Sequence, residues 1–292
     1  MRLIVVSGLS GSGKSVALNK LEDMDFFCID NVPAALLNTL IAQILETDDN
    51  LYENIAVGVD ARNRLADLES LPDLLHTLSK QGVDCETIFL HADTPILLKR
   101  YRETRRKHPL IEKGMSLRDA ISRERELLEP MSYSADLVID TTGTSIYEIG
   151  ELIKQRIGRR TAPDLSILIE SFGFKHGIPH DADFVFDVRC LPNPYWEAAL
   201  RPLNGKDASV IAFLQKHDIV NSMCADIVKF LDNRIAEYIA GERYYLTIAV
   251  GCTGGQHRSV YMVEQLVADL SKKYDHILSR HNEIPIPDVQ AV

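Results

Sequence analysis

The feature that most constrains this chain is a glycine-rich run near residue 10. The run matches the pattern GxxxxGK[ST] in full: Gly8, Leu9, Ser10, Gly11, Ser12, Gly13, Lys14 and Ser15. An apolar stretch precedes it and a helical pattern follows it, which is the context of a phosphate-binding P-loop. Glycines let the backbone turn its N–H groups onto phosphates, and a helix N-terminus adds partial positive charge. The run therefore predicts a strand, a loop and a helix that bind ATP; a glycine turn that binds nothing is the alternative.

Side chains around this loop can supply the chemistry that a triphosphate needs. Lys14 is expected to reach the β- and γ-phosphates, and the Ser15 hydroxyl to bind Mg²⁺. Asp60 ends an apolar run and is the candidate for the second magnesium ligand, unless it only caps a turn. We treat Lys14 and Asp60 as the catalytic pair. Asp30 ends another apolar run, where small P-loop kinases place the phosphoryl acceptor or its base; ordinary turn chemistry is the alternative.

Apolar runs alternate with helical patterns along the first half of the chain, as in a parallel sheet built from strand–helix–strand units. Strands are expected at residues 3–7, 26–30, 55–60, 87–91 and 137–140, and helices from about 14, 34, 65, 95, 117 and 145. The polar segment GRRTAPD marks a boundary. We predict a P-loop domain of small-kinase type over 1–158 and a second α/β, anion-binding domain over 159–292. Strands at 165–170, 184–188 and 245–250 and helices at 223–239 and 257–274 are expected in the second domain.

Composition narrows the class of protein. The net charge is −10, which argues against a generally basic nucleic-acid-binding surface. The 5 cysteines show no CxxC spacing, so neither a disulfide framework nor a zinc finger is predicted. Since no apolar run approaches the ~18 residues of a membrane span, we expect a cytoplasmic protein without membrane contact.

A basic segment, KRYRETRRK, occupies residues 99–107. On a helix, Arg102, Arg105 and Arg106 would lie on one face at i, i+3, i+4 spacing. Three interpretations are open: a lid that closes over the γ-phosphate, a landing site for RNA phosphates, or a solvated face that pairs with the acidic residues of 124–129.

A second anion-binding loop follows the apolar strand LTIAVG in the second domain. It consists of Cys252, Thr253, Gly254, Gly255, Gln256, His257, Arg258 and Ser259. A strand, a glycine turn and a helix N-terminus make an anion site, and the spacing Cys-x5-Arg-Ser is also the outline of a cysteine-phosphatase loop. Gly251 stands where those phosphatases usually place a histidine, so we favour phosphate binding without catalysis. A phosphatase and a purely structural turn are the alternatives.

These motifs together resemble the RapZ/YvcJ family of nucleotide-binding proteins. The resemblance covers almost the whole chain and rests on the run GLSGSGKS and on DARN, ESFGFKHGIP, FDVRCLPNPYW and GCTGGQHRS. It implies weak hydrolysis of ATP and GTP, with ATP at the P-loop and guanine nucleotide at Asp60, Ala61, Arg62 and Asn63. A regulatory ATPase/GTPase is therefore the expected function; a P-loop metabolite kinase is the alternative.

The resemblance also implies partners. Enteric members act as RNase adapters that bind small regulatory RNAs, deliver one to an endoribonuclease and sense glucosamine 6-phosphate through their C-terminal domain. The loop from Cys252 to Ser259 suits such a phosphorylated amino sugar, and we expect a homo-oligomer. This chain differs from the enteric members at two places. Enteric members end in a tail rich in Lys and Arg where this chain reads NEIPIPDVQAV, and they carry histidine where this chain has Tyr195.

Overall fold

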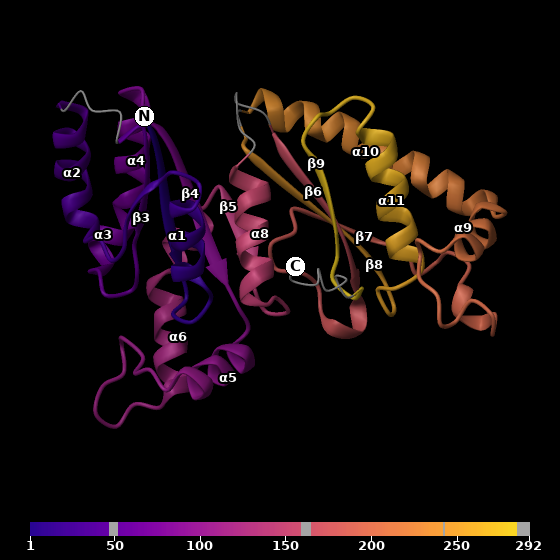
Figure 1. Ribbon diagram of the computed structural model, residues 1–292, viewed down its shortest axis with the longest axis horizontal. Coiled ribbons are helices and arrows are strands. Elements are labelled where there is room, and N and C mark those ends of the chain that lie inside the picture. The colour runs from indigo at the N-terminus through magenta and orange to yellow at the C-terminus, as the bar shows by residue number, and fades with distance from the viewer. Residues whose placement is uncertain (47–51, 159–164, 242, 285–292) are drawn as a thin grey trace. The chain divides into compact units, whose positions relative to one another are not determined.

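The computed structural model describes residues 1–46, 52–158, 165–241 and 243–284. The chain divides into two compact units, Met1–Arg159 and Arg160–Val292, and each is an α/β domain with a parallel sheet, which confirms the expected fold class (Figure 1). The expected linker beyond residue 158 and the tail beyond residue 284 lie outside the described residues. None of the helices in the described ranges combines the length and the apolar character needed to cross a membrane.

The first sheet has parallel strands in the order β2-β3-β1-β4-β5. Their bounds are β1 (Arg2–Gly8), β2 (Phe27–Ile29), β3 (Asn54–Gly58), β4 (Asp84–His91) and β5 (Leu137–Asp140). β1 lies at the centre, paired with β3 and β4, and its residues from Leu3 to Val6 are fully buried. A strand covered on both faces reads as a continuous apolar run, which explains the sequence LIVV. The carboxyl ends of β1, β2 and β3 meet at one edge of the sheet, so the loops that follow them can form one site.

Helices of this domain cover the sheet, and α5 and α6 lie beyond one end of it (Figure 1). Their bounds are α1 (Lys14–Glu22), α2 (Ala34–Glu46), α3 (Leu65–Glu69), α4 (Leu71–Lys80), α5 (Thr94–Thr104), α6 (Leu117–Leu127), α7 (Glu129–Tyr133) and α8 (Ile146–Ile157). Capping boxes begin α6, through Ser116 and Asp119, and α8, through Ser145 and Glu148. α4 was not expected as a separate helix. It carries Pro72 in its first turn, the one part of a helix that accepts proline without loss of a hydrogen bond.

The second sheet is also parallel, with the strand order β7-β8-β6-β9. Its strands are β6 (Ser166–Gly173), β7 (Phe184–Asp187), β8 (Tyr245–Cys252) and β9 (Ile277–His281), and its α-helices are α9 (Ala208–Gln215), α10 (Asp218–Ala240) and α11 (Arg258–Leu270). Short 3-10 turns, η2 (Phe174–His176) and η3 (Pro194–Trp196), follow β6 and β7. β8 and β6 are buried along their whole length, and α11 is buried on all sides from Arg258 to Val263. The glycine loop after β8 therefore starts from the core of this domain.

The helical face expected for Arg102, Arg105 and Arg106 is wrong. α5 ends at Thr104, and Arg105 follows in the left-handed region with φ 52°, so Arg106 lies beyond the helix. Pro109 disfavours a helical His108, and the His108 ring turns into the core, where it is 1% exposed. The chain must therefore leave the helix before residue 108.

One large side chain lies elsewhere than expected. A lone tryptophan is more typical of a core anchor than of a stacking platform, so Trp196 is predicted to lie in the core. In the structure it is 76% exposed, because Pro194 is the buried member of the turn η3.

Candidate functional site

The glycine run of the first domain has the backbone of a phosphate-binding loop. It leaves the end of β1 and enters α1, and Gly8, Gly11 and Gly13 have φ values of 146°, 91° and 110°. A Cβ at Gly8 would lie 2.4 Å from the carbonyl oxygen of Leu90 on β4. These positions therefore require glycine, because other residues rarely adopt such φ values.

The N–H groups of this loop fall into two sets. Three of them are used within the protein: Leu9 N–H donates to Leu90 O, Ser10 N–H to Glu124 Oε2, and Ser12 N–H to Leu9 O. The other set has no protein acceptor within the described residues and comprises Gly11, Gly13, Lys14 and Ser15. These N–H groups, at the N-terminus of α1, are free to bind an anion.

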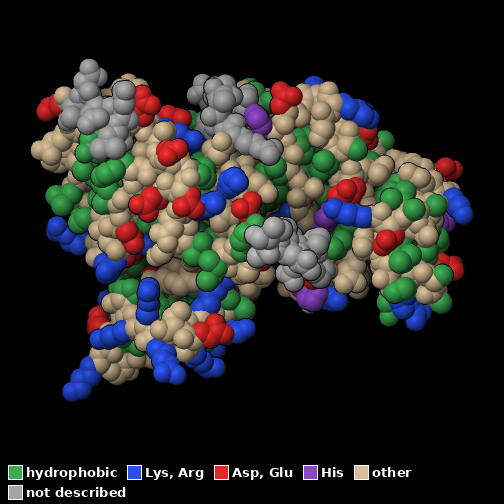
Figure 2. All heavy atoms as spheres, in the orientation of Figure 1, with side chains coloured by type: hydrophobic (Ala, Val, Ile, Leu, Met, Phe, Trp, Pro, Cys, Tyr) green, Lys and Arg blue, Asp and Glu red, His purple; other side chains and the backbone are tan. Residues whose placement is uncertain are grey.

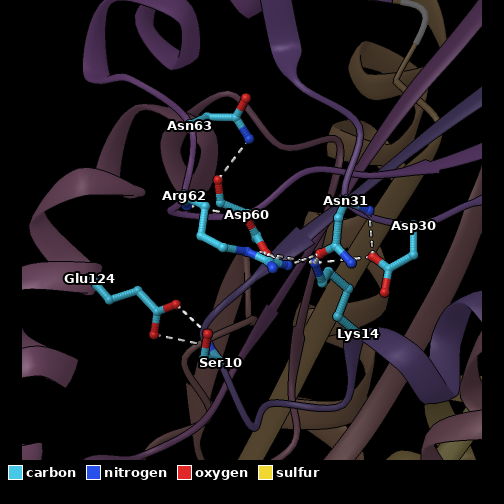
Figure 3. Close-up of polar contacts among 8 residues, drawn as sticks. All are labelled: Ser10, Lys14, Asp30, Asn31, Asp60, Arg62, Asn63 and Glu124. Carbon is cyan, nitrogen blue, oxygen red and sulfur yellow. Dashed lines mark hydrogen bonds and ion pairs between the residues drawn. The ribbon is translucent and has the colours of Figure 1, made fainter. Parts of the chain in front are cut away.

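Two carboxylates face the loop's lysine. Lys14 Nζ lies 3.2 Å from Asp30 Oδ1 and 3.5 Å from Asp60 Oδ2, as Figure 3 shows. Asp30 follows β2 and Asp60 follows β3, and both strands end at the same edge of the sheet as β1. Burial alone would raise the pKa of Asp60, but hydrogen bonds from Arg62 and the charge of Lys14 hold this pKa below its usual value. Asp60 is therefore ionised at neutral pH.

The DARN segment borders the same lysine. Arg62 donates from Nε and Nη2 to Asp60 Oδ2, and its Nη2 also donates to Asn31 Oδ1 (Figure 3). Asn63 Oδ1 accepts the backbone N–H of Ala34 at 2.7 Å and so satisfies an N–H in the first turn of α2. Ala61 is buried. The segment that the resemblance assigns to guanine nucleotide thus adjoins the P-loop.

The basic segment contributes a different arginine from the three that were expected. Arg100 Nη1 donates to Gly11 O and to Thr141 Oγ1, both at 3.0 Å, and Arg100 Nη2 donates to Thr141 O. Arg102, Arg105 and Arg106 are exposed, and their side chains form no hydrogen bond or ion pair within the described part of the chain. Figure 2 shows Lys and Arg side chains gathered over α5 and α6. The sequence held no signal that separated Arg100 from its neighbours.

Cys252 occupies the centre of the second anion loop. Its Sγ accepts the N–H of Gly255 at 3.2 Å and lies 3.2 Å from Ser259 Oγ. Burial would raise the pKa of this thiol, but hydrogen bonds from Ser259 and Gly255 and the nearby charge of Arg258 lower it below its usual value. The loop thus stabilises a negative charge at its own sulfur, as an anion-binding loop does.

Arg258, at the start of α11, is only 5% exposed. Its Nη1 donates to the carbonyl oxygens of Arg189 at 2.7 Å and Leu191 at 3.0 Å, and its Nη2 donates to Thr253 Oγ1 at 3.4 Å. The buried Nε has no partner within the described residues. The guanidinium therefore ties the loop after β7 to the anion loop and keeps one N–H unused.

Gly251 and Gly255 leave no room for side chains. A Cβ at Gly251 would lie 2.5 Å from ring atoms of both Phe172 and Phe174. Gly255 has φ 74°, and a Cβ there would lie 2.7 Å from the backbone nitrogen of Gly173. The histidine that cysteine phosphatases place before their nucleophile cannot be accommodated in this packing.

Comparison with known proteins covers both domains. The model described as RapZ-like N-terminal domain matches residues 1–161, and the RapZ C-terminal domain model matches residues 165–285. The chain is 50% identical over 287 residues to a nucleotide-binding protein of Methylococcus capsulatus, across 98% of this chain and 97% of that protein. It is 49% identical over 284 residues to a nucleotide-binding protein of Nitrosococcus oceani, across 97% of this chain and all of the relative.

Solved structures that align with part of this chain include small kinases. Shikimate kinase from Bacteroides thetaiotaomicron aligns with 53% of this chain and 98% of its own, at 15% identity and a TM-score of 0.38. A gluconokinase from Sinorhizobium meliloti aligns with 51% of this chain and 87% of its own, at 23% identity and a TM-score of 0.33.

Proposed function

The chain belongs to the RapZ family of nucleotide-binding proteins, and we propose that it is a regulatory enzyme that slowly hydrolyses ATP and GTP at its P-loop. One observation carries the proposal: the loop that carries unused N–H groups also carries a lysine whose ammonium lies beside two carboxylates. Lys14 would exchange Asp30 and Asp60 for the β- and γ-phosphates of the nucleotide, while the N–H groups of Gly11, Gly13 and Ser15 bind phosphate oxygens.

The residues beside Lys14 fit a magnesium ion. Mg²⁺ prefers oxygen ligands, and the hydroxyl of Ser15 and the ionised carboxylate of Asp60 supply them. Bound there, the ion would neutralise charge on the phosphates. Arg62 stays within 2.6 Å of Asp60 and holds its carboxylate in one orientation. Asp60 to Asn63 would serve GTP in the same site, since they adjoin the P-loop.

Replacement of Lys14 tests nucleotide binding directly. Lys14→Ala removes the charge placed on the phosphates, so we expect the Kd for ATP to rise at least about tenfold in calorimetry while the circular dichroism spectrum is unchanged. Lys20→Ala is the matched control, because Lys20 lies on the same helix and forms its ion pair with Asp23, away from the P-loop. Unchanged affinity in Lys14→Ala would show that the P-loop does not bind nucleotide.

Asp30 favours a second candidate function, phosphoryl transfer to a small hydroxyl compound. Its side chain is 40% exposed and faces Lys14, so it could accept a proton from such an acceptor. A kinase should turn over much faster when its acceptor is present. A regulatory enzyme should hydrolyse ATP at the same slow rate with each member of a panel of sugars and polyols.

For the C-terminal domain we propose binding of a phosphorylated amino sugar and of RNA. The loop from Cys252 to Ser259 supports the first proposal, and glucosamine 6-phosphate is the candidate that the family suggests. Exposed aromatic side chains support the second: Trp196 and Tyr195 are 76% and 48% exposed, and the Arg201 guanidinium lies 4.8 Å from the Tyr195 ring centroid. On this proposal the protein is a cytoplasmic homo-oligomer that presents a small regulatory RNA to an endoribonuclease.

A further inference from the structure

A buried carboxylate accepts hydrogen bonds from Ser10 of the P-loop. Glu124, on α6, is fully buried and its two oxygens contact one loop residue (Figure 3). Oε2 accepts the backbone N–H of Ser10 at 2.9 Å, and Oε1 accepts the Ser10 hydroxyl at 2.5 Å. A buried acid that binds backbone and side chain of the same residue fixes both the position and the orientation of that residue.

The same carboxylate is bound from its other side. His108 Nε2 lies 3.1 Å from Glu124 Oε2. His108 Nδ1 accepts the backbone N–H of Leu110, so Nε2 carries the hydrogen and donates to Glu124. His108 is also buried and its ring lies against Tyr101, with centroids 5.3 Å apart. Glu124 thus connects the P-loop to the segment that follows the basic stretch after α5.

The neighbouring loop residues are held in a similar way by groups outside the loop. Arg100 Nη1 donates to Gly11 O at 3.0 Å, and Thr141 Oγ1 donates to Ser12 O at 2.8 Å. Three consecutive residues of the P-loop are therefore each bound by a side chain far away in the sequence. Gly11, the first residue with an unused N–H group, is one of these three residues.

We propose that Glu124 is a positioning residue for nucleotide: by holding Ser10 it sets the direction of the free N–H groups from Gly11 onward. The inference rests on nucleotide binding at the P-loop. Two opposing effects follow from a buried anion near a triphosphate. Its charge disfavours the phosphates, but three hydrogen-bond donors compensate that charge, and misplacement of several N–H groups weakens binding more. Positioning is therefore the dominant effect.

The test compares two glutamates of one helix. Glu124→Gln keeps the side-chain size but turns an NH₂ group toward a hydrogen-bond donor, whereas Glu126→Gln changes an exposed glutamate two residues away. We expect Glu124→Gln to raise the Kd for a non-hydrolysable ATP analogue about tenfold and to lower kcat/KM by at least as much, at a temperature where the variant is folded. Glu126→Gln should stay within about twofold of wild type. Affinity in Glu124→Gln that equals or exceeds the wild-type value overturns the proposal.

A second variant keeps the test decisive if Glu124→Gln does not fold. Ser10→Ala removes only the hydroxyl bonded to Oε1, so a smaller rise in Kd is expected. In the double variant the two effects on Kd should not add, because both remove the same contact. Additive effects, or no effect of Ser10→Ala when Glu124→Gln is unfolded, contradict a positioning role. A wild type that binds no nucleotide would refute the proposed function and this inference together; the glutamine result alone refutes only the inference.

Discussion

At the scale of the residue, Asp60 is contacted by two cations at once. Its Oδ2 lies 3.5 Å from Lys14 Nζ and 2.6 Å from Arg62 Nη2. If Lys14 moves to the phosphates when nucleotide binds, Arg62 still balances the charge of Asp60. The carboxylate can then remain ionised in a buried position, as a magnesium ligand must.

Asp60→Asn should separate catalysis from binding. The amide is a weaker ligand for Mg²⁺ than the carboxylate, and the metal acts most strongly on charge that develops during phosphoryl transfer. We expect kcat for ATP hydrolysis to fall at least about tenfold and the Kd for ATP to change less than about threefold. Asp67→Asn, at a surface pair with Arg64, is the control and should change neither value. Equal losses in kcat and affinity would assign Asp60 to the structure of the loop or to base recognition.

At the scale of the element, the sequence predicts every strand of the two sheets except the edge strand β9. β1 and β8 are continuous apolar runs because both of their faces are covered. β9 reads ILSRH and its strand character comes from pairing with β6, a partner more than 100 residues away. The candidate site shows the same contrast between local sequence patterns and long-range contacts. The P-loop is local and was predicted, whereas Glu124 and Arg100 reach it across 114 and 89 residues of sequence, where no spacing pattern exists.

β9 also contains a titrating group that affects stability. His281 Nδ1 lies 2.9 Å from Ser171 Oγ, and its Nε2 lies 2.8 Å from Glu264 Oε1, which also pairs with Lys206. Burial lowers the pKa of His281 below its ordinary value of 6.5, although the hydrogen bond to Glu264 opposes this. The unfolded chain therefore takes up a proton at higher pH than the folded chain. Stability is fully present above pH 6.5 and is lost as pH falls from there through the folded pKa.

His281→Gln should reduce this pH dependence. We expect the unfolding temperature of the full chain to drop between pH 7.5 and pH 5.5 in wild type and to drop less in the variant. His217→Gln removes one histidine outside this network and should keep the wild-type slope. A slope that is the same in wild type and in His281→Gln would show that other groups control acid stability.

At the scale of the whole molecule, the same arrangement of strand, glycine loop and helix occurs in both domains. In each domain a buried parallel strand, β1 or β8, ends in a glycine loop that opens a helix. Each domain also has its own hydrophobic core, one around β1 and β3, the other around β6 and β8. Loss of ligand binding in one domain should therefore leave the chemistry of the other intact.

Arg258→Ala tests this separation. It removes the guanidinium that joins the anion loop to the carbonyls of Arg189 and Leu191, so affinity for glucosamine 6-phosphate in calorimetry should fall at least about tenfold, and RNA binding should fall with it. ATP hydrolysis should be unchanged.

Cys252→Ser should keep phosphosugar binding, since the backbone donors remain. If wild type hydrolyses p-nitrophenyl phosphate and Cys252→Ser does not, the loop is a phosphatase site; normal binding in Arg258→Ala would make it only a turn.

The packing around Gly251 limits what this loop could become in evolution. Gly251 is paired with Phe172 on the neighbouring strand, and any side chain at Gly251 would collide with Phe172 and Phe174. A lineage that acquired the phosphatase histidine at this position would first have to shrink both rings, and the step at the buried Phe172 would leave a cavity at a cost of about 3–5 kcal/mol. Such intermediates are selected against, since that cost is a large part of a domain's total stability. The two phenylalanines thus keep a histidine at this position out of reach of a single substitution.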